Sequence, residues 1–515
     1  MNIRKHTSVI LGLVLACGFV SCFNDTAFDI IKMPHMLDTL LYKLEPPSGA
    51  ALWAKTVVSG SDESTFNSVA AGSDGVYAAG YIKDTGNYEF NNGTIAKGTS
   101  TAHNVVLVKY DFNGKAQWAK TVVSGTPASA FNAVAVGSDG IYAAGKINNT
   151  TLFNFGDSQT VAGTCSGANP NIVLVKYDFD GTTQWAKSLY AGTTASEFNS
   201  VAVGSDGVYA AGYIIGTTTF DFGTSTNHQT ATGLNSGKNI VLVKYDFGGN
   251  AQWAKTVSLG PNASEYNSVA VGSDGVYAAG YIIGTSEFDF PTSTTPKTVT
   301  GPDSGANIVI VKYDFTGNAL WAKTDTITMT SGTSYPSQFN SVAVGSDGIY
   351  AAGSIFGQSL YNFGPSTAHG GYLNGKNTLL VKYNSTDGSA KWARAVSNGP
   401  NESELKSVSV GSNGVYVAGY ITGYATFDFG NNITATGATY IKNIIVMEYG
   451  IYGLPHWATT VSDGSFSNFL SVSAGSDGVY TAGWIFSDAR FDFGNYITVA
   501  GSYTGYNVVL AKYKP

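Results

Sequence analysis

One tryptophan-headed segment recurs along almost the whole chain. The segment reads like Trp-Ala-Lys-Thr-Val and begins at Trp53, Trp118, Trp185, Trp253, Trp321, Trp392 and Trp457. Successive tryptophans lie 65 to 71 residues apart in a chain of 515 residues. A period of this length predicts one structural unit copied seven times, which overrides the three or four domains that length alone would suggest.

Four strand-like patterns follow one another within each unit, illustrated here by the third. We expect strand A at 198–203, strand B at 208–214, strand C at 239–245, and strand D in the segment that begins at Trp253. An Asp-Gly pair between A and B is typical of a short hairpin, because Gly accepts a positive φ. No stretch inside the units has the apolar spacing of a long amphipathic helix. The unit is therefore predicted to be a four-stranded antiparallel meander.

A single meander of this size cannot cover both of its faces, and radial repetition of four-stranded blades covers them. An open β-solenoid is the alternative, but its rungs are much shorter. The repeats begin with a lone strand D at Trp53 and end with a strand C at 507–513. We therefore predict an all-β fold, a seven-bladed β-propeller over residues 50–515, in which the N-terminal strand D completes the last blade and removes two exposed sheet edges.

Two residue types recur at fixed places, and a structural role is expected for both. The tryptophans that open strand D are expected to pack blade against blade, with a ligand-stacking ring as the alternative. An asparagine opens every strand C, where its amide can satisfy backbone groups, with ligand binding as the alternative. These asparagines are Asn104, Asn171, Asn239, Asn307, Asn377, Asn443 and Asn507.

Three further repeated features are also read as structural. The Asp-Gly turns supply one carboxylate each, whereas calcium needs several acids close together, so a turn role is expected. The glycine inside strand B, such as Gly80, predicts a bulge or a close backbone approach. A Phe-x-Phe element between strands B and C, such as Phe220-Asp221-Phe222, fits a short strand with two buried rings.

Composition and motifs exclude several functional classes. The formal charge of −7 argues against a nucleic-acid partner. The six histidines occupy different repeat positions, and no zinc-binding, nucleophile-elbow, phosphate-loop or dinucleotide motif is present. We therefore expect no catalytic, cofactor-binding or metal-binding residue and no cofactor.

The N-terminus has the layout of an export signal. Arg4 and Lys5 precede an apolar run at 9–21, and Cys22 follows it. Phe19-Val20-Ser21-Cys22 resembles a bacterial lipoprotein cleavage box, which implies a signal peptide at 1–21, lipidation of Cys22 and a lipidated tether at 22–49. Cys17, after Val14-Leu15-Ala16, is the alternative. Cys165 would then be the one thiol of the mature domain, so no disulfide could form within it.

The repeat also resembles a known family. Residues 199–213, followed by 239–245 and Trp253, are similar to the bacterial β-propeller repeat often labelled SBBP, and the resemblance covers 50–515. It implies a propeller of an extracellular or envelope protein and supplies no catalytic residues. The hairpin at 111–118 has a weaker likeness to quinoprotein-type repeats, which normally form eight blades.

These observations lead to an expectation about function. We expect a lipid-anchored propeller of the bacterial cell envelope, at the outer membrane or cell surface, that acts as a monomeric binding or adhesion module. The partner would be an unidentified protein or glycan, bound at the face of the B–C and D–A loops. The chain would contact the membrane through its lipid anchor alone. The alternative is a propeller enzyme, either acting on glycans or using a quinone as a dehydrogenase.

Overall fold

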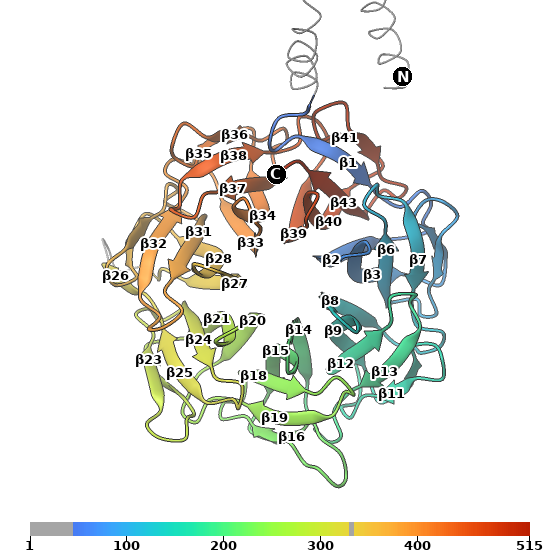
Figure 1. The fold of residues 1–515 in the computed structure, drawn as a ribbon, viewed down its shortest axis with the longest axis vertical. Coiled ribbons are helices and arrows are strands. Elements are labelled where there is room, and N and C mark those ends of the chain that lie inside the picture. Colours follow the sequence, from blue (N-terminus) through green and yellow to red (C-terminus); the bar gives the residue numbers. More distant parts are fainter. Residues whose placement is uncertain (1–44, 329–333) are drawn as a thin grey trace, which may run out of the picture. The chain divides into compact units, whose positions relative to one another are not determined.

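The computed structural model describes residues 45–328 and 334–515. In this part of the chain there are 43 β-strands and no helix. Residues 48–515 form one compact unit in which seven four-stranded antiparallel sheets surround a central opening (Figure 1). The predicted all-β, seven-bladed propeller is confirmed.

Each blade runs A, B, C, D from the centre of the ring outward. Blade 1 consists of β2 (Ser64–Ala71), β3 (Val76–Lys83), β6 (His103–Tyr110) and β7 (Ala116–Lys120). Blades 2 and 3 are formed by β8 (Ser129–Gly137), β9 (Gly140–Asn148), β12 (Pro170–Tyr177) and β13 (Thr183–Lys187), and by β14 (Ser196–Gly204), β15 (Gly207–Ile215), β18 (Lys238–Tyr245) and β19 (Ala251–Lys255). Blades 4 and 5 are formed by β20 (Ser264–Gly272), β21 (Gly275–Ile283), β24 (Ala306–Tyr313) and β25 (Ala319–Lys323), and by β27 (Ser337–Gly345), β28 (Gly348–Phe356), β31 (Lys376–Tyr383) and β32 (Ala390–Ala395). Blade 6 is formed by β33 (Ser403–Val410), β34 (Val415–Thr422), β37 (Lys442–Tyr449) and β38 (Pro455–Thr459).

Blade 7 is assembled from both ends of the propeller. It combines β39 (Ser467–Ala474), β40 (Val479–Phe486) and β43 (Tyr506–Tyr513) with β1 (Ala51–Lys55) (Figure 1). Trp53 of β1 lies opposite Lys512 of β43. Gly49 donates its backbone N–H to Lys514 at 2.8 Å, and Lys514 donates to Ala50 at 3.0 Å. The C–D turns of the other blades contain the same two bonds. The predicted closure by the N-terminal strand D is therefore confirmed.

The hydrophobic core lies between neighbouring blades. The cluster between blades 1 and 2, for example, joins Tyr77 and Leu107 of blade 1 to Ile141 and Val173 of blade 2, and all four are fully buried. Because every blade depends on its neighbours for burial, closing the ring covers two sheet faces that an open array would leave in water.

The glycine of strand B packs directly against strand A. At Gly80, an added Cβ would lie 1.9 Å from the carbonyl oxygen of Thr65, and the register of strand A shifts between Phe66 and Ser68. The structure thus contains both features that the sequence offered as alternatives, a close backbone approach and a bulge.

The segments between strands B and C are more ordered than expected. In blade 1, β4 (Asn87–Glu89) pairs with β5 (Ile95–Lys97), and Tyr88 and Phe90 are fully buried, as the Phe-x-Phe pattern predicts. The second strand of each hairpin was not predicted from the sequence. It is only three or four residues long with at most one buried position, which is too short to show the alternation of apolar and polar residues that marks a strand. The related strands are β10 (Leu152–Asn154), β11 (Thr160–Ala162), β16 (Thr219–Asp221), β17 (Thr230–Thr232), β22 (Glu287–Phe290), β23 (Lys297–Thr300), β29 (Leu360–Asn362), β30 (Thr367–His369), β35 (Thr426–Asp428), β36 (Thr434–Thr436), β41 (Arg490–Asp492) and β42 (Thr498–Ala500). A further short strand, β26 (Thr326–Thr328), lies in the D–A connection before blade 5 and pairs with β29.

These hairpins fold back along the outer edge of the blades. At the tip of the first hairpin, Asn91 donates to the carbonyl oxygen of Gly114 at 3.1 Å and accepts from the N–H of Ala116 at 3.0 Å. Both partners lie where the C–D turn leads into strand D. Much of each B–C segment therefore runs along the rim instead of standing at the B–C end as a free loop.

Candidate binding surface

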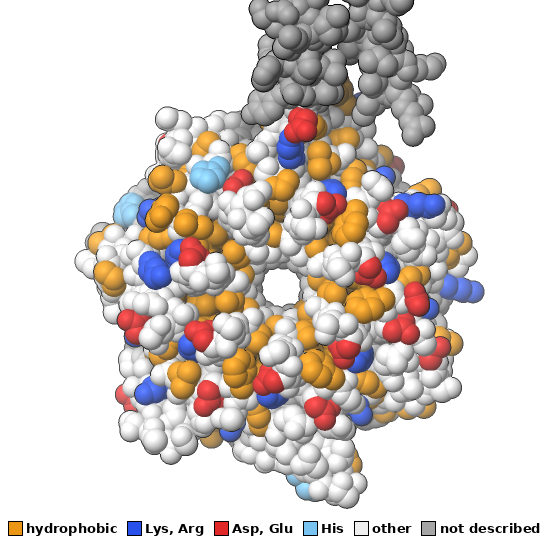
Figure 2. All heavy atoms as spheres, viewed as in Figure 1, with side chains coloured by type: hydrophobic (Ala, Val, Ile, Leu, Met, Phe, Trp, Pro, Cys, Tyr) orange, Lys and Arg blue, Asp and Glu red, His pale blue; other side chains and the backbone are white. Residues whose placement is uncertain are grey.

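The two ends of the propeller are built differently. The A–B and C–D turns lie at one end, which we call the turn end, and the B–C and D–A connections lie at the other, which we call the loop end. A face of the ring with acidic and basic side chains gathered around the central opening is shown in Figure 2.

A repeated set of polar contacts occupies the turn end. In blade 1, Asp74 accepts from the hydroxyl of Tyr77 at 2.8 Å and from Nζ of Lys109 at 2.6 Å. Lys109 also donates to the carbonyl oxygen of Phe179 in blade 2, as does the indole N–H of Trp118. The same carboxylate, hydroxyl and ammonium groups meet at Asp139, Tyr142 and Lys176, at Asp206, Tyr209 and Lys244, at Asp274, Tyr277 and Lys312, at Asp347, Tyr350 and Lys382, and at Asp477, Tyr480 and Lys512. We call this arrangement the turn latch.

The strand D tryptophans therefore join blades at the turn end. Trp321, Trp392 and Trp457 are buried and the other four are half-buried. Six of them donate their indole N–H to a turn carbonyl of the next blade, such as Trp53 to Phe112 at 3.1 Å. The sequence predicts the packing of these rings. The carbonyl that accepts from each indole, and the bonds of each turn aspartate to a tyrosine and a lysine, appear only in the structure.

Blade 6 lacks the turn latch. Glu448 replaces the lysine, Asn413 replaces the aspartate, and Nδ1 of His456 lies 3.2 Å from Glu448. The indole N–H of Trp457 is buried, with no partner among the described residues. This tryptophan packs against Gly49, at the place where blade 7 is closed by the two ends of the propeller.

The seven strand C asparagines hold the B–C connections in place. All seven are fully buried. Oδ1 of Asn104 accepts from the backbone N–H groups of Thr99 and Ser100, at 2.9 and 2.8 Å, and its Nδ2 donates to Asp84 and Ala102. Such an asparagine supplies the backbone groups of a turn with partners inside the protein.

Two series of serines link neighbouring blades, and sequence reasoning missed both. Ser64 Oγ accepts from the N–H of Val508 at 3.1 Å, and the first residue of strand A does the same in every blade. Ser68 Oγ accepts from Val134 in the next blade at 3.1 Å. A serine recurs at the first of these positions in all seven units, and this recurrence could have revealed the first series from the sequence.

At the loop end, five positions in each blade project from the same side of the sheet. In blade 1 they are Glu63, Thr65, Tyr81, Lys83 and His103, because Thr65 lies opposite Tyr81 and Lys83 lies opposite His103. We call these positions the loop-end layer. In the same order they are Ala128, Ala130, Lys146, Asn148 and Pro170 in blade 2, Ala195, Glu197, Tyr213, Ile215 and Lys238 in blade 3, Ala263, Glu265, Tyr281, Ile283 and Ala306 in blade 4, Pro336, Gln338, Ser354, Phe356 and Lys376 in blade 5, Glu402, Glu404, Tyr420, Thr422 and Lys442 in blade 6, and Phe466, Asn468, Trp484, Phe486 and Tyr506 in blade 7.

Blades 3, 4 and 6 share a charged version of this layer. Glu404 is 1% exposed, accepts from Tyr420 at 3.0 Å, and lies 3.0 and 2.9 Å from the ammonium groups of Lys376 and Lys406. Burial by itself would raise the pKa of Glu404, but the two lysines outweigh burial and hold the pKa at about 2. Glu197 and Glu265 accept from Tyr213 and Tyr281 in the same way. These groups pair with one another inside the protein.

Blade 7 carries an aromatic version instead. Four of its five loop-end positions are Phe466, Trp484, Phe486 and Tyr506, whereas no other blade has more than two aromatic residues there. The ring centroids of Phe466 and Trp484 are 5.3 Å apart, those of Trp484 and Tyr506 are 4.9 Å apart, and both pairs meet edge to face. All four side chains are half-buried. We call them the blade 7 aromatic cluster.

Charged residues of blade 1 border this cluster. A Cβ added at Gly505 would lie 3.3 Å from Cγ of Glu63, which places Glu63 beside the residue that precedes Tyr506. Lys83 lies 3.4 Å from Asp62 and 3.6 Å from Glu63. Further into blade 1, the rings of Tyr81 and His103 stack at 3.9 Å. Burial lowers the pKa of His103.

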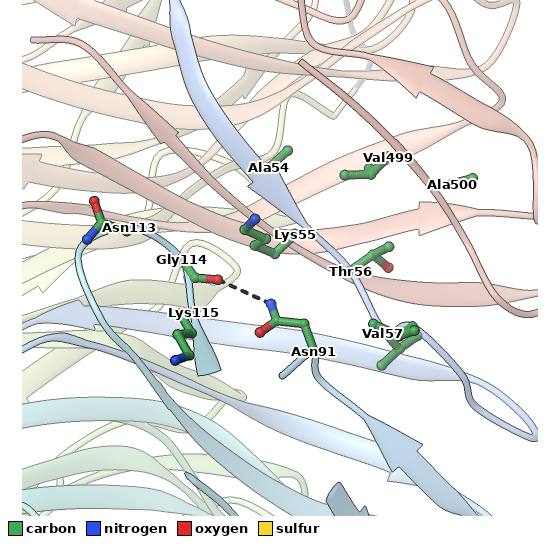
Figure 3. Close-up of a pocket in the computed structure, with 11 residues that line it drawn as sticks. Ala54, Lys55, Thr56, Val57, Asn91, Asn113, Gly114, Lys115, Val499 and Ala500 are labelled. Atoms are coloured by element: carbon green, nitrogen blue, oxygen red, sulfur yellow. Dashed lines mark hydrogen bonds between the residues drawn. The ribbon is translucent and has the colours of Figure 1, made fainter. Parts of the chain in front are cut away.

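A surface pocket of about 440 Å³ lies elsewhere, on the outer edge between blades 7 and 1 (Figure 3). It is lined by β1 and the residues after it, by the C–D turn of blade 1 and by Val499 and Ala500. Its charged side chains are those of Lys55 and Lys115, and Asn91 is already bonded to Gly114 (Figure 3). No acid or histidine lines it, so it offers no acid–base pair for catalysis.

Cys22 and Cys17 lie outside the described residues. Cys165 is buried in blade 2 as a free thiol. Within 45–328 and 334–515, no three His, Cys, Asp or Glu side chains are grouped closely enough to hold a metal ion. No helix in these ranges has the length and apolar character needed to cross a membrane.

Comparison with known proteins gives distant similarities. No family model matches the chain. The chain is 28% identical over 190 residues to the uncharacterized WD repeat-containing protein L264 of Acanthamoeba polyphaga mimivirus, an alignment that covers 32% of this chain and 13% of that protein. Among solved structures, a phage phi92 endosialidase aligns with a TM-score of 0.36 and 9% identity, over 90% of this chain and 68% of the endosialidase. The quinohemoprotein alcohol dehydrogenase of Comamonas testosteroni aligns with a TM-score of 0.32 and 11% identity, over 90% of this chain and 76% of the enzyme.

Proposed function

We propose that this chain is a lipid-anchored propeller of the bacterial cell envelope that binds or adheres to a partner through its loop end. The observation that carries the proposal is the difference between the two ends. The turn latch is built from the same residue types in six of seven blades, whereas the loop-end layer changes from blade to blade. A uniform end suits a scaffold, and a varied surface held on a rigid scaffold suits recognition.

The envelope location rests on the N-terminal sequence. The basic residues, the apolar run and Cys22 are typical of a lipoprotein signal, and the resemblance of 199–213 to SBBP repeats agrees with an exported protein. Replacing Cys22 by Ala should move the protein from the detergent phase to the aqueous phase in a phase-partitioning assay. Unchanged partitioning would reject Cys22, and the same change at Cys17 would then decide between the two.

An enzyme acting on glycans is the second candidate, and one observation favours it. The loop end breaks the repeat at the junction of blades 7 and 1, where Asp62, Glu63 and Lys83 gather. A sugar-cleaving site needs two carboxylates that flank the scissile bond, and Asp62 and Glu63 are two carboxylates gathered at one place. Release of reducing ends from a polysaccharide by the purified protein would support this second candidate.

The binding function can be tested without knowing the partner. Full-length protein in detergent would be applied to an array of glycans and extracellular-matrix proteins, together with two sets of variants. Alanine changes in the loop-end layer should abolish binding to every array component that the wild-type protein binds. Asp139→Asn in the turn latch should leave that binding intact. The proposal would be overturned if loop-end and turn-latch variants lost binding equally, or if folded wild-type protein bound no component of the array.

A further inference from the structure

The blade 7 aromatic cluster occupies positions that are charged and paired in other blades. In blades 3, 4 and 6 a glutamate of strand A accepts from a tyrosine hydroxyl of strand B. In blade 7 the equivalent pair is Asn468 and Trp484, which lie directly opposite each other. Trp484 is also the one tryptophan of the chain's eight that does not open a strand D. The change therefore replaces a paired polar contact with a large aromatic surface.

This replacement leaves a buried hydrogen-bond acceptor without a partner. Asn468 is 4% exposed, and its Oδ1 has no donor within the part of the chain that the structure describes. The indole of Trp484 has no hydroxyl to offer in place of that of tyrosine. An unpaired buried acceptor is unfavourable, so blade 7 gives up a hydrogen bond that blades 3, 4 and 6 keep, and has the aromatic surface in its place.

Polar groups also border the aromatic surface on the blade 1 side. Glu63 lies next to Gly505, and Asp62 lies close enough to Tyr503 that its negative charge raises the pKa of the Tyr503 hydroxyl. Lys83 neutralises part of this acidic charge at 3.4 and 3.6 Å. The result is a half-buried aromatic area with carboxylate oxygens at its edge.

We propose that this surface, at the loop end between blades 7 and 1, binds a neutral saccharide. A pyranose ring has a face of C–H groups that packs on aromatic rings, and a rim of hydroxyls that donate to carboxylate oxygens. Trp484 and Tyr506 supply the aromatic area, and Glu63 and Asp62 accept from the rim. The assignment rests on the proposed binding function and names its ligand class.

The rings do not form a cage for a quaternary ammonium group. The centroids of Phe466 and Phe486 are 4.7 Å apart and those of Phe486 and Tyr506 are 5.3 Å apart. At these separations the rings contact one another and leave no space between them for a cation. The ligand must therefore lie on top of the cluster. This suits a pyranose, which can place its C–H face on the rings and keep its hydroxyl rim free for the neighbouring carboxylates.

The repeat itself supplies the test variant. The double change Asn468→Glu and Trp484→Tyr gives blade 7 the pair found in blades 3, 4 and 6. By the same repeat relationship, Lys442 of blade 6 corresponds to Lys238 and Lys376, which pair with the glutamate of the following blade. The new carboxylate would thus find a cation, so the variant should fold. Tyr496→Ala, at a side chain of blade 7 that is 99% exposed, is the control.

Titration calorimetry of the full-length protein in detergent would use maltopentaose, cellopentaose and chitopentaose as probes. We expect at least one probe to bind, the double variant to weaken that binding at least tenfold with its melting temperature kept, and Tyr496→Ala to bind as wild type does. Binding that survives the double change, or no binding of any of the three probes, overturns the inference. If a matrix protein nevertheless binds the loop end, the proposed function stands while the saccharide assignment fails.

Discussion

Trp53 donates its indole N–H to the carbonyl oxygen of Phe112 at 3.1 Å, and so joins the N-terminal strand to blade 1. The same strand pairs with β43 through Trp53 and Lys512. One five-residue strand therefore completes blade 7 and connects it to the next blade. This double role makes the ring continuous, so the stability of the whole propeller depends on a contact between its two ends.

The closure predicts a strong effect of a short truncation. Deleting residues 508–515 removes most of β43, which pairs with both β1 and β40. Blade 7 would lose its third strand and the partner of its fourth, and cooperative unfolding should be lost or its midpoint should fall sharply. Circular dichroism during heating measures this. A truncated protein that melts within about two degrees of the intact one would contradict the closure.

The serines between inner strands predict a smaller, local effect with a natural control. Ser68→Ala removes the acceptor for the backbone N–H of Val134, and should cost about 1 kcal/mol of unfolding free energy. Blade 2 carries Ala133 at the same position, so Ala133→Ser should add a bond to blade 3 and stabilise the protein. Urea unfolding measures both changes. Equal stability of all three proteins would show that these contacts contribute nothing.

Asp325 predicts a stability change near neutral pH. The residue is fully buried, and burial raises its pKa to about 7 despite hydrogen bonds from Ser337 and Thr324. Because the unfolded chain releases this proton near its ordinary pKa of 3.8, stability should fall as pH rises from about 4 through 7.

Asp325→Asn removes the titration while keeping an oxygen acceptor. The variant should melt several degrees higher than the wild type at pH 8, and the difference should shrink below pH 4. Melting curves across this range measure it. A difference that does not change with pH would contradict the shifted pKa.

Glu404 predicts the opposite dependence. Its pKa is held at about 2, so the stability from its contacts with Lys406 and Lys376 is present above about pH 4.5 and lost as pH falls through 2. Glu404→Gln should cost about 3 kcal/mol at pH 7, and the cost should fade toward pH 2. Chemical unfolding at several pH values measures this, and Glu402→Gln, just before β33, is a control that should have little effect.

The fold could be read from the sequence because its signals are local. Each Trp, each Asp-Gly turn and each strand C asparagine lies in a fixed order within one unit, and the mismatch between the first strand D and the last strand C gives the closure. The blade 7 aromatic cluster could not be read in this way. Phe466, Trp484 and Tyr506 are separated by 18 and 22 residues, and only the register of β39, β40 and β43 brings them together.

Hydrogen exchange measured by mass spectrometry tests the central claim most directly, namely that recognition belongs to the loop end and the turn end is scaffold. A saturating partner should slow exchange at the backbone amides of 62–67, 81–84, 466–468 and 484–488, and should leave the turns at 72–75 and 137–140 unchanged. Protection confined to those turns, with the loop end unaffected, would contradict the account.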